Sequence, residues 1–480
     1  MKRLVLLLAV CIMFACKSET NENVVEKEEI TIQEIAPIST EVMETAVIYE
    51  ANIRQYSPEG TFDEFTKDIP QLKQLGVKII WLMPVFPISE TKRKATGGAD
   101  SKFAADFPKE EQAKYLGSYY AVSDFTKINP EFGTIEDFRE LLKAAHDNGI
   151  YVILDWVPNH TGWDHEWLKT NPEYYTQNDN GEVIHPEGTD WTDVADLNYD
   201  NKDMRKEMIE DMSYWITEEG VDGFRCDVAG SVPADFWEEA IPKLRDKKDI
   251  FMLAEAWEPE LLKGNLFDMA YAWDGHHLFN AIAKEEKTYE AWDKYELKRA
   301  LDYEKDDILM NFVTNHDENS WNGAIKERMG EASELFTVFS YIIPGMPLIY
   351  SGQEYDLGHR LKFFEKDSIP KTKGETWNLL KKLGALKNTY PALNGGKDKA
   401  SMMAFETDNA NVIKYTRTKG GKKLTFFGNF SGKTQTFKMM NADGMTDYMT
   451  GDVFKLNNSE TTLGAWKFKI LINNEEDNSL

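Results

Sequence analysis

The chain has 480 residues and a formal net charge of −27, and 42% of its residues are hydrophobic. It is long enough for a large and a small domain, because single hydrophobic cores stop growing at roughly 250 to 300 residues. The acidity disfavours nucleic acid and anionic membrane surfaces as partners, since clustered Lys and Arg are needed to bind both.

The first residues predict export. Lys2 and Arg3 precede an apolar run, residues 4–15, that is too short to cross a bilayer. The sequence MFAC at 13–16 resembles the lipobox of bacterial lipoproteins. That resemblance implies a signal peptide at 1–16 and a lipid on Cys16; an ordinary signal peptide cut nearby is the alternative. We therefore expect a location in the cell envelope, on the periplasmic or outer-membrane surface, with membrane attachment through the N-terminal lipid only.

Residues 17–45 are rich in Glu, Thr and Asn and predict a flexible tether. The region 46–390 alternates apolar runs with helix-like segments such as 61–75 and 134–148. Near-continuous apolar runs are typical of parallel strands buried on both faces. Eight such units predict the α/β class and a (β/α)8 TIM barrel. The predicted strands lie in the runs 46–53, 77–86, 151–160, 221–229, 250–257, 269–273, 308–319 and 346–352.

Two other regions have a different pattern of apolar and polar residues. Residues 161–205 show little periodicity and predict an excursion after the third strand that walls one side of the site. Residues 391–480 contain short alternating runs separated by turn signals, which predict a C-terminal antiparallel β-sandwich domain.

Polar residues gather at the carboxyl ends of the predicted strands, where barrels of this type carry their active sites. Three of them are acids on separate strands, and hydrolysis of a glycosidic bond needs two carboxyl groups across that bond. The strand-end residues are Asp155, Asn159, His160, Arg225, Asp227, Glu255, His316 and Asp317.

Four blocks occur in one order along the chain: DWVPNH at 155–160, GFRCDV at 223–228, LAEAW at 253–257 and TNHDEN at 314–319. In this order they resemble the signature blocks of glycoside hydrolase family 13, the α-amylase family. The resemblance implies that Asp227 is the nucleophile, Glu255 the general acid and base, and Asp317 a third catalytic carboxylate that grips sugar hydroxyls.

The same resemblance implies substrate-binding roles for four more residues. His160 and His316 match two histidines that hydrogen-bond the sugar, and Arg225 would keep Asp227 ionised by lowering its pKa. Tyr120 matches a ring that stacks on the sugar, with Tyr119 as the competing assignment.

The chain departs from the family after the nucleophile, where Gly230 and Ser231 stand in place of a Lys-His pair. That pair usually helps to bind the sugar beyond the cleavage point and a calcium ion. Asn159 still matches a calcium ligand of many members, so calcium is possible but no cofactor is required. The segment 193–201 resembles a further family block that does not decide between α-1,4 and α-1,6 linkages.

The leading hypothesis is a retaining α-glucan hydrolase that cleaves α-1,4 bonds in starch or maltodextrins, with an α-glucan oligo- or polysaccharide as its partner. An α-glucan transglycosylase or an α-1,6-active member of the same family is the alternative within the enzyme class. A non-catalytic glycan-binding lipoprotein is the alternative from another class, and the complete set of three acids argues against it.

Overall fold

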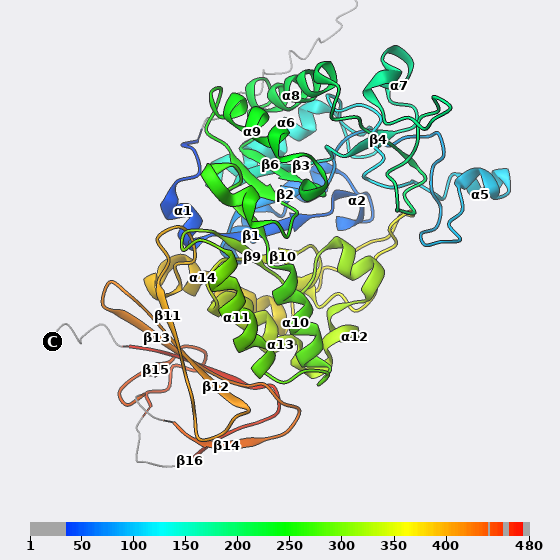
Figure 1. The fold of residues 1–480 in the computed structure, drawn as a ribbon. Coiled ribbons are helices and arrows are strands. Elements are labelled where there is room, and N and C mark those ends of the chain that lie inside the picture. Colours follow the sequence, from blue (N-terminus) through cyan, green and yellow to red (C-terminus); the bar gives the residue numbers. More distant parts are fainter. Residues whose placement is uncertain (1–34, 440–441, 455–459, 474–480) are drawn as a thin grey trace, which may run out of the picture. The chain divides into compact units, whose positions relative to one another are not determined.

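The computed structural model describes residues 35–439, 442–454 and 460–473 (Figure 1). Eight parallel strands close into a barrel in the spatial order β1-β10-β9-β8-β7-β6-β3-β2. Each predicted run supplies one of these strands, so the predicted (β/α)8 barrel is confirmed. The strands are β1 Val47–Ala51, β2 Val77–Leu82, β3 Tyr151–Trp156, β6 Gly223–Cys226, β7 Phe251–Ala254, β8 Met269–Tyr271, β9 Leu309–Asn311 and β10 Met346–Tyr350.

Side chains alternate between the two sides of the barrel wall, as the two-residue period of a strand requires. On β6, Phe224 and Cys226 join the hydrophobic core that also contains the helix side chains. Arg225, between them, points into the barrel, where its guanidinium carbon lies 4.9 Å from the centre of the Trp81 ring. Trp81 belongs to a separate apolar cluster that fills the barrel interior.

Helices follow the strands and surround the barrel (Figure 1). The segment 134–148 forms α6, which begins with a capping box between Thr134 and Asp137, as its sequence predicts. The helices of this region are α2 Ile53–Tyr56, α3 Phe62–Thr66, α4 Ile69–Gln74, α5 Lys109–Gln112, α6 Ile135–Asp147, α8 Lys202–Thr217, α9 Ala234–Arg245, α10 Trp273–Ala283, α11 Glu290–Asp302, α12 Ile325–Met329, α13 Ser333–Ile342 and α14 Glu375–Thr389.

The segment 61–75 does not form the single helix that its pattern predicts. It is divided into α3 and α4 at Lys67 and Asp68. Pro70, in the first turn of α4, explains the break. Within a continuous helix its ring would clash with the carbonyl of Thr66 and it would have no N–H to donate.

The end of the predicted tether is folded. Residues Thr40–Thr45 form helix α1, whose first turn is capped by the Ser39 hydroxyl. Met43 is buried with the barrel-interior cluster, and the Glu44 carboxylate accepts hydrogen bonds from the backbone N–H groups of Gly396 and Asp398 at 2.8 and 2.6 Å. The prediction of a tether to residue 45 rested on polar composition and overlooked these anchors; residues 17–34 lie outside the described part.

The excursion between β3 and β6 carries a two-stranded antiparallel sheet, β4 His160–Gly162 with β5 Val194–Asp196, and helix α7 Glu166–Thr170. His160 pairs directly with Asp196 in this small sheet. The strand pairing fixes the far end of the excursion beside the carboxyl end of β3.

The C-terminal region is an antiparallel β-domain, as predicted. Tyr415 of this domain packs on Phe339 of α13, with ring centres 5.9 Å apart, and Arg417 donates to the backbone oxygen of Ile342 at 2.9 Å. Its sheets have the orders β11-β12-β13-β17-β15 and β14-β16. The strands are β11 Ser401–Phe405, β12 Val412–Lys419, β13 Lys422–Asn429, β14 Gln435–Lys438, β15 Thr446–Asp447, β16 Glu460–Leu463 and β17 Phe468–Ile472.

Among the residues that the structure describes, none of the helices has the length and apolar character needed to cross a bilayer. The predicted signal peptide and Cys16 lie outside the described residues.

Candidate active site

The predicted strand-end residues line one cavity of about 450 Å³ at the carboxyl end of the barrel. Asp227 follows β6 directly, Glu255 follows β7, and His316 and Asp317 follow β9. Tyr120 reaches the same cavity from the long connection between β2 and α6. The predicted residues in the lining are Tyr120, His160, Asp227, Glu255, His316 and Asp317.

Arg225 lies beneath this cavity and holds three carboxylates together. It has no exposed surface. Its Nη1 donates to Asp155 Oδ1 at 2.8 Å and to Asp227 Oδ1 at 2.9 Å, and its Nη2 lies 2.9 Å from Glu255 Oε2. Its Nε donates to the Tyr271 hydroxyl at 3.1 Å. The guanidinium thereby fixes Asp227 and Glu255 around one rigid, planar group.

The two acids differ in proton affinity. Burial raises the pKa of Asp227 to about 6, although the Arg225 guanidinium opposes this shift. Burial also raises the pKa of Glu255 to about 7, again against Arg225 and with a contribution from the neighbouring Asp227 carboxylate. Arg225 thus lowers the pKa of Asp227, in the predicted direction, without cancelling the effect of burial. Burial therefore leaves both carboxyl groups able to exchange a proton near neutral pH.

The backbone after Asp227 is strained and contacts Glu255. Val228 adopts a left-handed conformation with φ of 35°, which is costly for a β-branched residue. In this conformation its N–H donates to Glu255 Oε2 at 2.8 Å. Glu255 is therefore held by Arg225 and by a main-chain donor next to Asp227.

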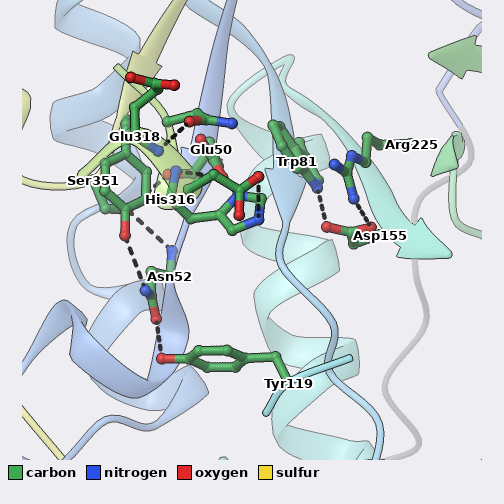
Figure 2. Close-up of polar contacts among 12 residues, drawn as sticks. Glu50, Asn52, Trp81, Tyr119, Asp155, Arg225, His316, Glu318 and Ser351 are labelled. Atoms are coloured by element: carbon green, nitrogen blue, oxygen red, sulfur yellow. Dashed lines mark hydrogen bonds and ion pairs between the residues drawn. The ribbon is translucent and has the colours of Figure 1, made fainter. Parts of the chain in front are cut away.

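His316 is bound on both ring nitrogens. Its Nδ1 lies 2.5 Å from Glu50 Oε1 (Figure 2). Its Nε2 lies 2.8 Å from the Tyr120 hydroxyl and 3.3 Å from Asp317 Oδ2. Burial alone would lower the pKa of His316, but the carboxylates of Asp317 and Glu50 outweigh it and raise the pKa to about 9. At neutral pH this histidine is a cation.

His160 is the opposite case. It is buried, and burial lowers its pKa to about 4, so the ring is neutral at neutral pH. Its Nδ1 lies 3.2 Å from Asn159 Nδ2, and the Trp191 ring lies 5.6 Å away. The two histidines that the sequence assigned to one task therefore carry different charges.

Tyr120 and Tyr119 are separated clearly by the structure. The Tyr120 hydroxyl donates to Asp155 Oδ2 at 3.1 Å, and its ring forms part of the cavity lining. Tyr119 is buried and donates to Asn52 Oδ1 at 3.1 Å, away from the lining (Figure 2). Asp155 also accepts from Trp81 Nε1 at 3.1 Å, which makes it the link between Tyr120 and Arg225.

Gly230, at the first position of the missing Lys-His pair, lies against Glu258. A Cβ at position 230 would meet the Glu258 carboxylate, which accepts from the Trp257 N–H at 2.9 Å. Because Glu258 is exposed and its side chain can move, this contact does not exclude a larger residue at position 230.

Calcium at Asn159 finds little support in the arrangement of the described residues. The Asn159 amide nitrogen is directed at His160 Nδ1. Across the described part of the chain, no group of three or more His, Cys, Asp or Glu side chains is arranged to hold a metal ion. Calcium also binds amide and backbone oxygens, but no carboxylate or histidine group of that size in the described residues supports a site at Asn159, and the chemistry below uses no metal.

Sequence reasoning missed Glu50, Trp81 and Tyr271. Glu50 lies on β1, fully buried, where it contacts His316. The available signal was a single carboxylate inside an otherwise apolar strand, because a buried charge requires a partner. Trp81 and Tyr271 look like ordinary barrel-core aromatics, and only their contacts with Asp155 and Arg225 distinguish them.

A parallel barrel with paired carboxyl groups at its strand ends has the arrangement that enzymes acting on glycosidic bonds need. The family described as "Alpha amylase, catalytic domain" matches residues 26–411. The chain belongs to this family of glycoside hydrolases and transglycosylases, and it is an enzyme.

Its relatives differ in what they do. It is similar to alpha-amylase MalA of Haloarcula japonica, at 25% identity over 85% of this chain and 59% of that protein. It is similar to a 4-alpha-glucanotransferase of Thermotoga neapolitana, at 32% identity over 62% of this chain and 67% of that protein. Among solved structures, an alpha-amylase from Lactobacillus plantarum superposes with a TM-score of 0.78 at 28% identity, covering 90% of this chain and all of that one.

Proposed function

We propose that the protein is a retaining α-glucan hydrolase that cleaves α-1,4-glucosidic bonds of starch or maltodextrins. The observation that carries this proposal is the arrangement around Arg225, where one buried guanidinium contacts both Asp227 and Glu255. These two carboxyl groups differ in pKa in the order that a nucleophile and a general acid require.

The reaction proceeds in two steps. The Asp227 carboxylate attacks the anomeric carbon while protonated Glu255 donates its proton to the glycosidic oxygen, and the carbon–oxygen bond to the leaving chain breaks. This leaves a β-glycosyl ester on Asp227 and an ionised Glu255. Glu255 then removes a proton from water, which attacks the same carbon and releases Asp227. Two inversions retain the α configuration.

Other side chains of the cavity bind the sugar that lies between Asp227 and Glu255. Asp317 is the most exposed of the three acids, with 37% of its side chain accessible against 11% for Asp227 and Glu255, so it is free to accept sugar hydroxyls. The protonated His316 and the neutral His160 supply donors of different strength. Tyr120 offers its ring, fixed by Asp155 and His316.

Transfer to a second sugar is the alternative within this chemistry, because a glucanotransferase is among the similar proteins. Trp257, two residues beyond Glu255, is 52% exposed and offers a flat face on which an acceptor can stack. The two outcomes differ only in whether water or a sugar hydroxyl attacks the glycosyl ester.

The test incubates the protein with maltoheptaose and with pullulan and resolves the products over time. Hydrolysis predicts products shorter than maltoheptaose, whereas transfer predicts longer ones; cleavage of pullulan alone would indicate α-1,6 specificity. The matched variant Asp227→Asn must abolish turnover. Equal activity of this variant would contradict the mechanism, and retention of glucans without turnover by the wild type would favour a glycan-binding protein.

We also propose that Cys16 carries the lipid that holds the enzyme in the cell envelope, which rests on the lipobox resemblance alone. Growth with radiolabelled palmitate would test it. Wild type should incorporate label and Cys16→Ser should not.

A further inference from the structure

One end of the active-site cavity is lined by residues from three segments that are far apart in the sequence. The connection after β2 contributes Gly97, the connection after β9 contributes Trp321, and the connection after β10 contributes Phe363 and Phe364. We call these four residues the end wall.

Backbone contacts join the connection after β2 to the connection after β10. The Leu116 N–H donates to the Phe364 oxygen at 2.7 Å, and Tyr115 forms an antiparallel bridge with Glu365. Buried Arg54 donates to the backbone oxygens of Gly117 at 2.9 Å and Phe363 at 3.3 Å, so one guanidinium connects both. The two connections therefore meet at these residues.

The side chains of the end wall are packed on one another. The Trp321 ring centre lies 5.0 Å from that of Phe363, and Phe363 lies 5.0 Å from Phe364. The Gly97 backbone lies against the Trp321 ring, since a Cβ at position 97 would come within 2.8 Å of it. Arg360 donates to the Trp321 backbone oxygen at 3.1 Å and ties this residue down.

The end wall lies on the glycone side of the cleavage point. Phe363 is stacked parallel to Tyr120, with ring centres 6.5 Å apart, and Trp321 follows Asp317 by four residues. Tyr120 and Asp317 hold the sugar that Asp227 attacks. Glu255, by contrast, protonates the leaving chain, and the residue two positions on, Trp257, lines a different cavity of about 400 Å³.

We infer that the end wall limits the glycone side to a short blind pocket, so that the enzyme binds free non-reducing ends and acts as an exo-enzyme. To be cleaved at an internal bond, a glucan chain must extend out of the cleft at both ends. The end wall blocks the end on the glycone side. This inference rests on the proposed hydrolase function.

The test compares two substrates with the full-length protein. One is 4-nitrophenyl α-maltoheptaoside with a free non-reducing end, and the other carries a 4,6-ethylidene block on that terminal sugar. Loss of each substrate is followed by chromatography. Because forcing extra atoms against a packed wall costs at least about 1 kcal/mol, we expect the blocked substrate to react at least roughly fivefold more slowly.

Two tryptophan variants form a matched pair. Trp321→Ala removes a ring of the end wall. It should raise the ratio of the rate on the blocked substrate to the rate on the free substrate severalfold, toward one. Trp257→Ala removes a similarly exposed ring, 52% against 44%, which lines the other cavity; it should leave the blocked-to-free ratio unchanged, because any effect on the leaving side applies to both substrates.

Equal rates on both substrates by the wild type would overturn the inference while leaving the hydrolase proposal intact. Reaction with neither substrate would overturn the proposed function, and the inference with it. The wild-type ratio decides the question even if Trp321→Ala does not fold.

Discussion

The active site joins two regions that are built differently. Arg225 and the carboxylates that it contacts lie at or near strand ends, have at most 11% of each side chain exposed, and are joined through one guanidinium; these carboxylates are Asp155, Asp227 and Glu255. The end wall consists of loop residues, with Trp321 44% exposed, held by backbone hydrogen bonds between distant segments. The difference teaches that the pairing of the barrel strands positions the catalytic side chains. The contacts between loops, in contrast, determine which glucan chains can enter the active site.

Replacing Arg225 should give the largest loss of stability and turnover. This substitution changes the strand-end region and leaves the end wall untouched. Arg225→Met leaves three carboxylates, Asp155, Asp227 and Glu255, buried without their cation. Removal of one partner of a buried ion pair costs about 3–5 kcal/mol of unfolding free energy. Chemical denaturation should show that loss, together with loss of turnover. Lys298→Met, which breaks an exposed ion pair with Asp274, is the control and should change stability by no more than about 1 kcal/mol.

The acids should impose a bell-shaped pH dependence on kcat/KM. Asp227 must be ionised, so activity falls as pH drops below its pKa of about 6. Glu255 must be protonated, so activity falls as pH rises above its pKa of about 7. Each limb should approach a tenfold change per pH unit. Glu255→Gln should remove the alkaline limb and reduce kcat by roughly 10²- to 10⁴-fold; an alkaline limb that persists in this variant would assign it to another group.

Glu50→Gln should give a smaller and pH-selective loss. Glutamine can still accept the hydrogen bond from His316 Nδ1, but the carboxylate charge that helps to raise the pKa of His316 is gone. His316 should then lose its proton nearer neutrality, and kcat/KM should fall severalfold more at pH 8 than at pH 6.

The matched control for this change is Glu354→Gln. Glu354 is also a fully buried glutamate, but it binds the Tyr49 hydroxyl outside the cavity lining. Its pH profile should match that of the wild type. A uniform loss in Glu50→Gln at all pH values would show that Glu50 acts on structure and not on the charge of His316.

The smallest expected effect is that of metal removal. The described residues around Asn159 do not form a calcium shell, so dialysis against EDTA should change activity and the thermal midpoint very little. Asn159→Ala should be equally insensitive to chelator. A large loss that added calcium reverses would show that a calcium site exists.

Much of the barrel could be predicted because strands buried on both faces read as continuous apolar runs. The same runs placed Asp227 and Glu255 at strand ends. Each residue directly follows an apolar run, and a residue that follows a parallel strand lies at the carboxyl edge of the barrel. The contact of Glu50 with His316 joins residues 266 positions apart, and no local pattern encodes it. The end wall could not be predicted from the sequence either. The contact of Gly97 with Trp321 depends on loop conformations, which the periodicity of apolar residues does not describe.

The contact between Gly230 and Glu258 has a consequence for how this loop can change. A lysine at position 230 would meet the Glu258 carboxylate, which is itself bonded to the Trp257 N–H. Because the Glu258 side chain is exposed and carries the opposite charge, it can move aside and pair with the new ammonium group. The loop after Asp227 can therefore accept a cation without a prior change at residue 258.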